Sequence, residues 1–185
     1  MNFATIEFGV FFAAVLAVYF ILSRRWQNRF LLVASYIFYG WWDWRFCGLL
    51  LLSSLVDYFC ALKIDRTRSP DLPPSRRKLF LTVSVVTNLS ILGFFKYFDF
   101  FAESLARLAL SGGIELSLPA LRIILPVGIS FYTFQSMSYT IDVYRGELRA
   151  SENVVDVMLY VSLFTQLVAG PIERGRHLLP QITGS

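Results

Sequence analysis

The stretch of residues 125–146, LPVGISFYTFQSMSYTIDVYRG, constrains the fold of this chain most strongly. At about 1.5 Å per residue, a helix of this length would cross a bilayer. Yet it carries seven polar side chains, Ser130, Thr133, Gln135, Ser136, Ser138, Thr140 and Asp142. In lipid these groups would lack hydrogen-bond partners. We therefore expect the faces that carry them to meet protein, water or substrate.

A break near the start of this stretch is expected from two residues. Pro126 has no amide donor, and Gly128 relaxes the backbone. The sequence predicts a short piece that enters the membrane, breaks here and continues as a helix. At about 100° per residue, one arc of that helix holds Gln135, Ser138, Tyr139 and Asp142. Broken polar helices at membrane depth are typical of binding sites, so these four residues are candidates for a substrate path. Interhelical hydrogen bonds would require the same residues.

The composition indicates a membrane protein. Hydrophobic residues make up 56% of the chain, above the roughly 45–50% apolar content of soluble domains. Aromatic residues make up 17%. We predict an all-α polytopic transmembrane bundle of about five or six spans with broken or re-entrant helices. It forms a single membrane domain over residues 1–185, with no soluble domain. The net charge of +4 is spread between apolar runs, which excludes a nucleic-acid partner and indicates topology instead.

The positions of the basic residues predict how the chain crosses the membrane. Apolar residues 6–22 are followed at once by Arg24, Arg25 and Arg29, which places the N-terminus outside the cytoplasm. The basic residues 65–78 and the pair Arg145 and Arg149 would also be cytoplasmic. Membrane lipids are the expected neighbours of these spans.

The elements between these basic turns are predicted from their apolar runs. Residues 30–42 and 46–64 should form a helical hairpin with its aromatic tip outside. Residues 79–95 should return outward. Residues 100–110 should form a separate amphipathic helix in the outer interface, before Gly112 and Gly113 turn the chain.

Asp57 lies near the middle of an apolar run, where a carboxylate costs about 2.5–3.5 kcal/mol on insertion scales. It must find a partner. Either it forms hydrogen bonds with neighbouring helices, or it lines a substrate path. Ser84, Thr87 and Asn88 are expected to form interhelical hydrogen bonds.

The last element should run over residues 153–169 and end at Gly170 and Pro171, as a second broken or re-entrant helix. Gln166, Glu173 and Arg174 lie near this break. They would bind a substrate, seal the cytoplasmic mouth of a site, or form a solvated turn.

Motifs of soluble enzymes are absent from the sequence: it has no Gly-rich phosphate loop, no clustered metal ligands and no serine nucleophile elbow. We expect no metal and no bound cofactor. Cys47 and Cys60 lie in apolar runs and are expected to be small buried hydrophobic residues. The only imidazole, His177, has no orienting partner at a suitable spacing, so we assign no catalytic residue.

Three stretches of the sequence carry a family resemblance. They are SYIFYGWWD at residues 35–43, LPVGISFYTFQSMSYTIDVYRG at residues 125–146, and FTQLVAGPIERGRHLLPQ at residues 164–181. In this order and at these intervals they resemble the membrane-bound O-acyltransferases, in the bacterial branch that includes alginate O-acetylation and teichoic-acid D-alanylation proteins. The likeness runs over essentially the whole chain but corresponds to the N-terminal part of the family's chain.

The resemblance implies a protein of the bacterial cytoplasmic (inner) membrane that transfers an acyl group, expected to be acetyl, from a cytoplasmic thioester such as acyl-CoA or an acyl-carrier protein. Gln166, Glu173 and Arg174 would then be the candidates on the donor side. The acceptor would be a hydroxyl of an extracytoplasmic polysaccharide such as alginate, reached with a periplasmic acyltransferase partner. The family's catalytic histidine lies further on and matches no position here, so the chain is expected to be a fragment or a truncated relative that is inert alone. From the residues alone, a transporter or flippase suits broken polar helices equally well, and a non-catalytic scaffold is a third hypothesis.

Overall fold

The computed structural model describes residues 6–68, 74–111, 125–167 and 173–184. Every regular element in these ranges is a helix, which confirms the predicted all-α class. The elements are α1 (Ile6–Ile21), α2 (Arg24–Asp43), the 3-10 turn η1 (Trp44–Phe46), α3 (Cys47–Arg66), α4 (Pro74–Ser111), α5 (Ile129–Arg145), α6 (Val154–Ser162), α7 (Phe164–Leu167) and α8 (Gly175–Thr183).

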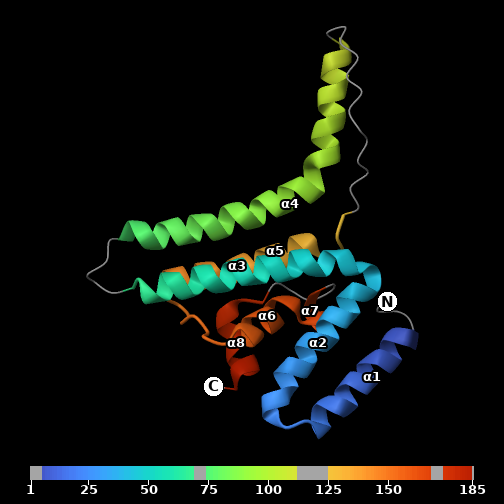
Figure 1. The fold of residues 1–185 in the computed structure, drawn as a ribbon, viewed down its shortest axis with the longest axis vertical. Helices are drawn as coiled ribbons and strands as arrows, with labels where there is room; N and C mark the ends of the chain where they lie inside the picture. The colour runs from blue at the N-terminus through green and yellow to red at the C-terminus, as the bar shows by residue number, and fades with distance from the viewer. Residues whose placement is uncertain (1–5, 69–73, 112–124, 168–172, 185) are drawn as a thin grey trace.

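The helices form two groups that meet through the C-terminal elements (Figure 1). The first group is α3, the first part of α4 and α5, which pack side by side. The second is the antiparallel pair of α1 and α2, which runs at an angle to the first group. The short helices α6, α7 and α8 fill the space between them, with α6 packed on both α2 and α3. Polar residues of α5, α6 and α8 are thereby brought together.

Two helical stretches, Arg24–Arg66 and Ser75–Ser111, are long and apolar enough to cross a membrane by length and composition. The predicted first span, residues 6–22, corresponds to α1, an apolar helix of 16 residues within the described part of the chain. Large apolar side chains such as Phe20, Trp42 and Phe101 point outward from these helices. Such surfaces suit lipid, as expected of a membrane protein.

The chain turns between α2 and α3 where the sequence predicted a hairpin tip. The Asp43 carboxylate accepts from the Arg45 backbone amide at 3.0 Å and pairs with its guanidinium at 2.6 Å, which fixes the single turn η1. The two limbs then diverge instead of lying side by side (Figure 1). The hairpin prediction was therefore wrong in this respect, because α3 packs on α4 and α5 while α2 packs on α6.

Helix α4 also differs from the prediction. The span expected at residues 79–95 and the interfacial helix expected at residues 100–110 form one continuous helix, Pro74–Ser111. The intervening residues, 96–99, contain neither Gly nor Pro, so nothing in them ends a helix. Its last part bends away from the other helices (Figure 1), and its Glu103 and Arg107 form an exposed ion pair at 3.6 Å. The turn predicted at Gly112 and Gly113 lies outside the described residues.

Helix α5 begins directly after Gly128, where the sequence predicted a helix to continue after a break. Gly128 has φ +74° and immediately precedes the helix, and the amide of Ile129 donates to the carbonyl of Pro126 at 3.2 Å. A Cβ at Gly128 would lie 2.8 Å from the carbonyl oxygen of Leu167, so the close approach of α7 also requires glycine. At the other end, Gly146 with φ +81° caps the helix. The short piece predicted before Leu125 falls outside the described residues.

The last predicted element is interrupted earlier than expected. Asn153 caps α6 by accepting from the amide of Val155 at 3.1 Å. Leu163, with φ −55° and ψ 113°, then leaves the helical region and separates α6 from the four-residue α7. The break expected at Gly170 and Pro171 lies beyond the part of the chain that the structure describes.

Candidate functional site

Two buried polar clusters lie on different faces of α5. The first, the Asp57 cluster, consists of Asp57, Ser53, Ser84, Asn88 and Ser136. The second, the Tyr160 cluster, consists of Tyr160, Gln135, Ser138, Tyr139, Asp142 and the backbone of Glu173. Because consecutive helical residues are about 100° apart, Ser136 points away from Gln135 and Ser138.

The Asp57 cluster ties α3, α4 and α5 together. The Asp57 carboxylate is fully buried and accepts hydrogen bonds from the hydroxyls of Ser84 and Ser136. The side-chain amide of Asn88 donates to both carboxylate oxygens, at 3.0 and 2.9 Å, and accepts from Ser53 at 2.5 Å. The carboxylate thus has the partners that its burial demands. Each of the three helices contributes at least one of these groups.

The Tyr160 cluster joins α5, α6 and the residues that precede α8. The hydroxyl of Tyr160 lies 3.0 Å from that of Ser138, 2.8 Å from the Glu173 carbonyl oxygen and 3.3 Å from the Gln135 carbonyl oxygen. The ring of Tyr160 contacts that of Tyr139 with centroids 6.1 Å apart. One phenol therefore holds residue 173 against the middle of α5.

Several polar atoms of the Tyr160 cluster lack partners. Both side-chain polar atoms of Gln135 are buried and have no hydrogen-bond partner among the described residues, and the same holds for Oδ2 of Asp142. Gln135 is fully buried and Asp142 is 4% exposed. Leaving buried polar groups unpaired costs about 1–3 kcal/mol each. These atoms are therefore suited to form hydrogen bonds with water or with a hydroxyl-bearing substrate.

Charged groups surround the end of this cluster. Arg174 and Arg176 lie close enough to Asp142 to act on its charge, as does Glu147. Arg176 also pairs with Glu147 at 3.5 Å. The hydroxyl of Tyr139 accepts from the backbone amide of Ser151 at 3.0 Å, which holds the α5–α6 connection against the cluster.

The structure brings together most of the residues predicted from the sequence, but not all of them. The substrate-path candidates that meet are Gln135, Ser138, Tyr139 and Asp142, joined by the donor-side candidates Glu173 and Arg174. Asp57 belongs to the other cluster. Gln166 does not join Glu173 and Arg174, because the adjacent Leu167 lies against Gly128 at the opposite end of α5.

Tyr160 is the residue of this site that the sequence did not single out. It stands in an apolar run, DVMLYVSLF, in which a tyrosine resembles any other core aromatic residue. A tyrosine in a buried run could have been identified because its hydroxyl needs a hydrogen-bond partner, which must come from a polar group on a neighbouring helix.

The only imidazole is a member of neither cluster. His177 is exposed on α8, and its Nε2 accepts from Nε of the adjacent Arg176 at 3.2 Å. Within the described ranges, no group of three His, Cys, Asp or Glu side chains could hold a metal ion.

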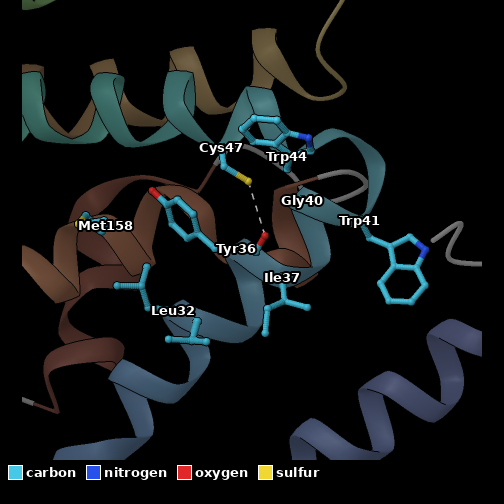
Figure 2. A pocket seen from close by; sticks show the side chains of 9 residues that line it. Leu32, Tyr36, Ile37, Gly40, Trp41, Trp44, Cys47 and Met158 are labelled. Atoms are coloured by element: carbon cyan, nitrogen blue, oxygen red, sulfur yellow. Dashed lines mark hydrogen bonds between the residues drawn. The ribbon is translucent and has the colours of Figure 1, made fainter.

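An apolar cavity of about 670 Å³ opens beside α2 (Figure 2). Its walls come from α2, the α2–α3 corner and α6, and they include Tyr36, Trp41, Trp44, Cys47 and Met158. The Cys47 thiol lies 3.7 Å from the Tyr36 carbonyl oxygen, and the Tyr36 hydroxyl has no partner among the residues described. Such walls accommodate hydrocarbon and exclude charged ligands.

Basic residues gather where α3 ends, α4 begins and α5 ends. Arg77 donates to the Tyr144 carbonyl at 2.6 Å and lies over the Tyr144 ring at 5.2 Å. Arg68 donates to the carbonyl of Gly146 at 3.4 Å. The two basic regions that the sequence assigned to one side of the membrane therefore lie at one end of the bundle.

Comparison with known proteins gives related chains over nearly the whole sequence. The chain is 40% identical over 176 residues to the probable alginate O-acetylase AlgI of Azotobacter vinelandii, covering 93% of this chain and 34% of that protein. It is 38% identical over 176 residues to the AlgI of Pseudomonas aeruginosa, covering 93% and 32%. It is 34% identical over 192 residues to a peptidoglycan O-acetyltransferase of Helicobacter pylori, covering 88% and 35%. No family model and no solved structure matches the chain.

These relatives confirm the resemblance that the three motifs indicated: the chain is related to the membrane-bound O-acyltransferases. Within that class, the relatives it matches are named alginate O-acetylase AlgI and peptidoglycan O-acetyltransferase. The chain spans about a third of the length of these curated relatives, 34% for the Azotobacter protein.

Proposed function

We propose that the chain is the N-terminal part of a membrane-bound O-acetyltransferase that acts on an extracytoplasmic polysaccharide such as alginate. The observation that carries this proposal is the identity of 38–41% to three AlgI proteins over 93% of the chain. Acetyl would come from a cytoplasmic thioester, acyl-CoA or an acyl-carrier protein, and reach the acceptor with a periplasmic acyltransferase partner. The transporter and scaffold hypotheses have no comparable support.

In this proposal the chain crosses the bacterial inner membrane about five or six times, with its N-terminus outside the cytoplasm. The non-helical residues before α5 and at Leu163 would be the breaks of re-entrant helices. The gathering of basic residues at one end of α3, α4 and α5 supports the orientation, because cytoplasmic ends carry excess Lys and Arg.

The Tyr160 cluster is the part of the chain that we assign to the substrate path. Its unpaired Gln135 and Asp142 atoms suit hydroxyl groups or ordered water. Arg174 lies near the Asp142 end, at the side where we place the thioester donor. Both oxygens of the Asp57 carboxylate accept hydrogen bonds from side chains of neighbouring helices, so we assign the Asp57 cluster to packing.

A chimera tests the proposal. The aligned N-terminal segment of the Pseudomonas aeruginosa AlgI is replaced by this chain, and the fusion is expressed in an alginate-producing bacterium that lacks its own AlgI. We expect acetyl ester to return to the secreted alginate. The remaining AlgI segment without this chain is the negative control, and the intact AlgI is the positive control. A chimera that reaches the membrane in normal amount but leaves the polymer unacetylated would contradict the proposal.

The chain of 185 residues alone is expected to be inert. General base catalysis needs a proton acceptor within about 2.6–3.2 Å of the attacking hydroxyl. The sole imidazole, His177, is exposed, and its Nε2 accepts a hydrogen bond from the adjacent Arg176. The test offers the purified chain a labelled thioester and a polysaccharide acceptor. Turnover that disappears in His177→Ala would show that this assignment is wrong.

Cysteine labelling tests the orientation. In a background with Cys47→Ala and Cys60→Ala, a cysteine replaces either Trp44 at the α2–α3 corner or Arg149 after α5; both positions are exposed. An impermeant thiol reagent should label position 44 in intact cells and position 149 only after lysis. The reverse pattern would invert the topology.

A further inference from the structure

A basic pocket of about 550 Å³ lies between the α1–α2 turn, the start of α6 and the end of α8. Three arginines of α2 line it, Arg24, Arg25 and Arg29, together with Asn28 and Asp156. It is separate from the Tyr160 cluster, and no residue of that cluster lines it. The function proposed above makes no use of it.

The pocket carries a net positive charge, and its arginines are available to bind an anion. Both oxygens of the one carboxylate, Asp156, accept amide hydrogen bonds at 2.9 Å, from Asn28 and Asn153. The ion pairs found in the described residues involve other arginines, so none neutralises Arg24, Arg25 or Arg29. Three positive charges against one negative charge leave a net charge of +2 facing the cavity. An anion with several acceptor oxygens matches these guanidinium groups.

An apolar cavity continues from the same face of α2. Leu31 follows Arg24 and Asn28 at helical spacing, i, i+4 and i+7, so the three side chains share one stripe. Leu31 lines an apolar cavity of about 280 Å³ whose other walls are Phe12, Leu16, Tyr19 and Phe20 of α1 and Phe164 of α7. A charged site is thus followed along the helix by a hydrocarbon site.

The wall of the basic pocket includes a tryptophan of the kind found at membrane interfaces, Trp26. Trp26 is 55% exposed, and the guanidinium of Arg29 lies 5.0 Å from its ring centre. Trp residues favour the headgroup level of a bilayer, and basic pockets between helices bind anionic headgroups there.

We propose that this pocket binds an anionic diacyl phospholipid, with the phosphate on Arg24, Arg25 and Arg29 and an acyl chain in the cavity beside Leu31. The phosphate groups of a soluble thioester donor such as acyl-coenzyme A are the other source of this chemistry. The adjoining apolar cavity and the exposed tryptophan favour the lipid. The inference depends on membrane insertion and not on acetyl transfer, so the chimera experiment can succeed or fail independently of it.

The test measures lipid retention. The full chain is purified in neutral detergent, mixed with phosphatidylglycerol or phosphatidylcholine of identical acyl chains, and analysed by native mass spectrometry. We expect a clear preference for phosphatidylglycerol that weakens with added salt. Since each arginine near an anionic headgroup is worth about a fivefold change in affinity, the triple change Arg24→Gln, Arg25→Gln and Arg29→Gln should reduce retention by at least about tenfold.

The matched control removes three exposed arginines from the other basic region, Arg66→Gln, Arg76→Gln and Arg149→Gln, and should retain the lipid. A second variant with lysine at positions 24, 25 and 29 keeps the charge that directs insertion, and it should retain phosphatidylglycerol better than the glutamine variant. The proposal is overturned by equal retention of the two lipids by the wild type. It is also overturned if the glutamine variant keeps the lipid but loses binding of free coenzyme A.

Discussion

The Asp57 cluster and the Tyr160 cluster are both buried, polar and built partly from α5, yet they differ in how their polar atoms are paired. In the Asp57 cluster, three side chains from α4 and α5 converge on one carboxylate. In the Tyr160 cluster, one phenol is well paired while Gln135 and one oxygen of Asp142 have no partner among the described residues.

The difference separates two uses of polar residues in a membrane bundle. Paired groups hold helices together, since no water is available to replace a lost partner. Unpaired groups cost free energy unless something else binds them. We therefore expect substitutions in the Asp57 cluster to act on folding and those in the Tyr160 cluster to act on transfer.

The largest effect is expected from Asp57→Ala. It leaves the donors of Ser84, Asn88 and Ser136 without their acceptor, at a cost on the order of 3 kcal/mol. The yield of monodisperse protein after a heating series in detergent measures the loss. Asp43→Ala, which removes an ion pair with the exposed Arg45, is the control and should change the midpoint temperature of the heating series little. Equal midpoint temperatures for the two variants would contradict a packing role for Asp57.

A smaller loss is expected from Gly128→Ala, at the entry to α5. The new side chain must adopt φ +74° and lies 2.8 Å from the Leu167 carbonyl oxygen, so the cost should be about 2 kcal/mol. Gly93→Ala in α4 is the control, because its Cβ meets nothing within 4 Å and alanine favours a helix. The same thermal series should rank Gly128→Ala well below Gly93→Ala; the opposite ranking would mean that the break is not fixed by glycine.

The smallest loss of stability is expected from Tyr160→Phe, about 1 kcal/mol, because one hydroxyl with partners on α5 and at residue 173 disappears. Tyr58→Phe is the matched control, since its hydroxyl donates to a single backbone carbonyl, that of Glu152, at 2.7 Å. Limited proteolysis near residue 173 should speed up only in Tyr160→Phe. Unchanged cleavage would argue against Tyr160 as the group that holds this segment.

The sequence predicted those features that depend on unusual residues. Pro126 and Gly128 marked the start of α5, and a carboxylate at position 57 in an apolar run required partners that Ser84 and Asn88 supply. Thr87, the third residue expected to form an interhelical hydrogen bond, makes no side-chain hydrogen bond in the described part of the chain, because neighbouring positions on a helix face different ways.

Features set by tertiary packing were not predictable in this way. Leu163 interrupts the last element without a Gly or Pro, and residues 96–99, which include Lys96 and Asp99, continue α4 where a boundary was expected. Tyr160 and Gln166 show the same limit within the site. Their neighbours are decided by the packing of α6 and α7 on α5, which no local pattern records.

The assignment of the two clusters is tested most directly by the ratio of acetylation to folded protein in the chimera with AlgI. Asp142→Ala and Asp57→Ala are compared at equal expression, with folded membrane protein quantified by fluorescence-detected chromatography. Asp142→Ala should keep most of the folded protein and lose at least about tenfold in acetylation per folded molecule, by removing a group of the substrate path. Asp57→Ala should lose protein and acetylation in proportion. Proportional losses in Asp142→Ala as well would contradict the account and make both clusters packing sites.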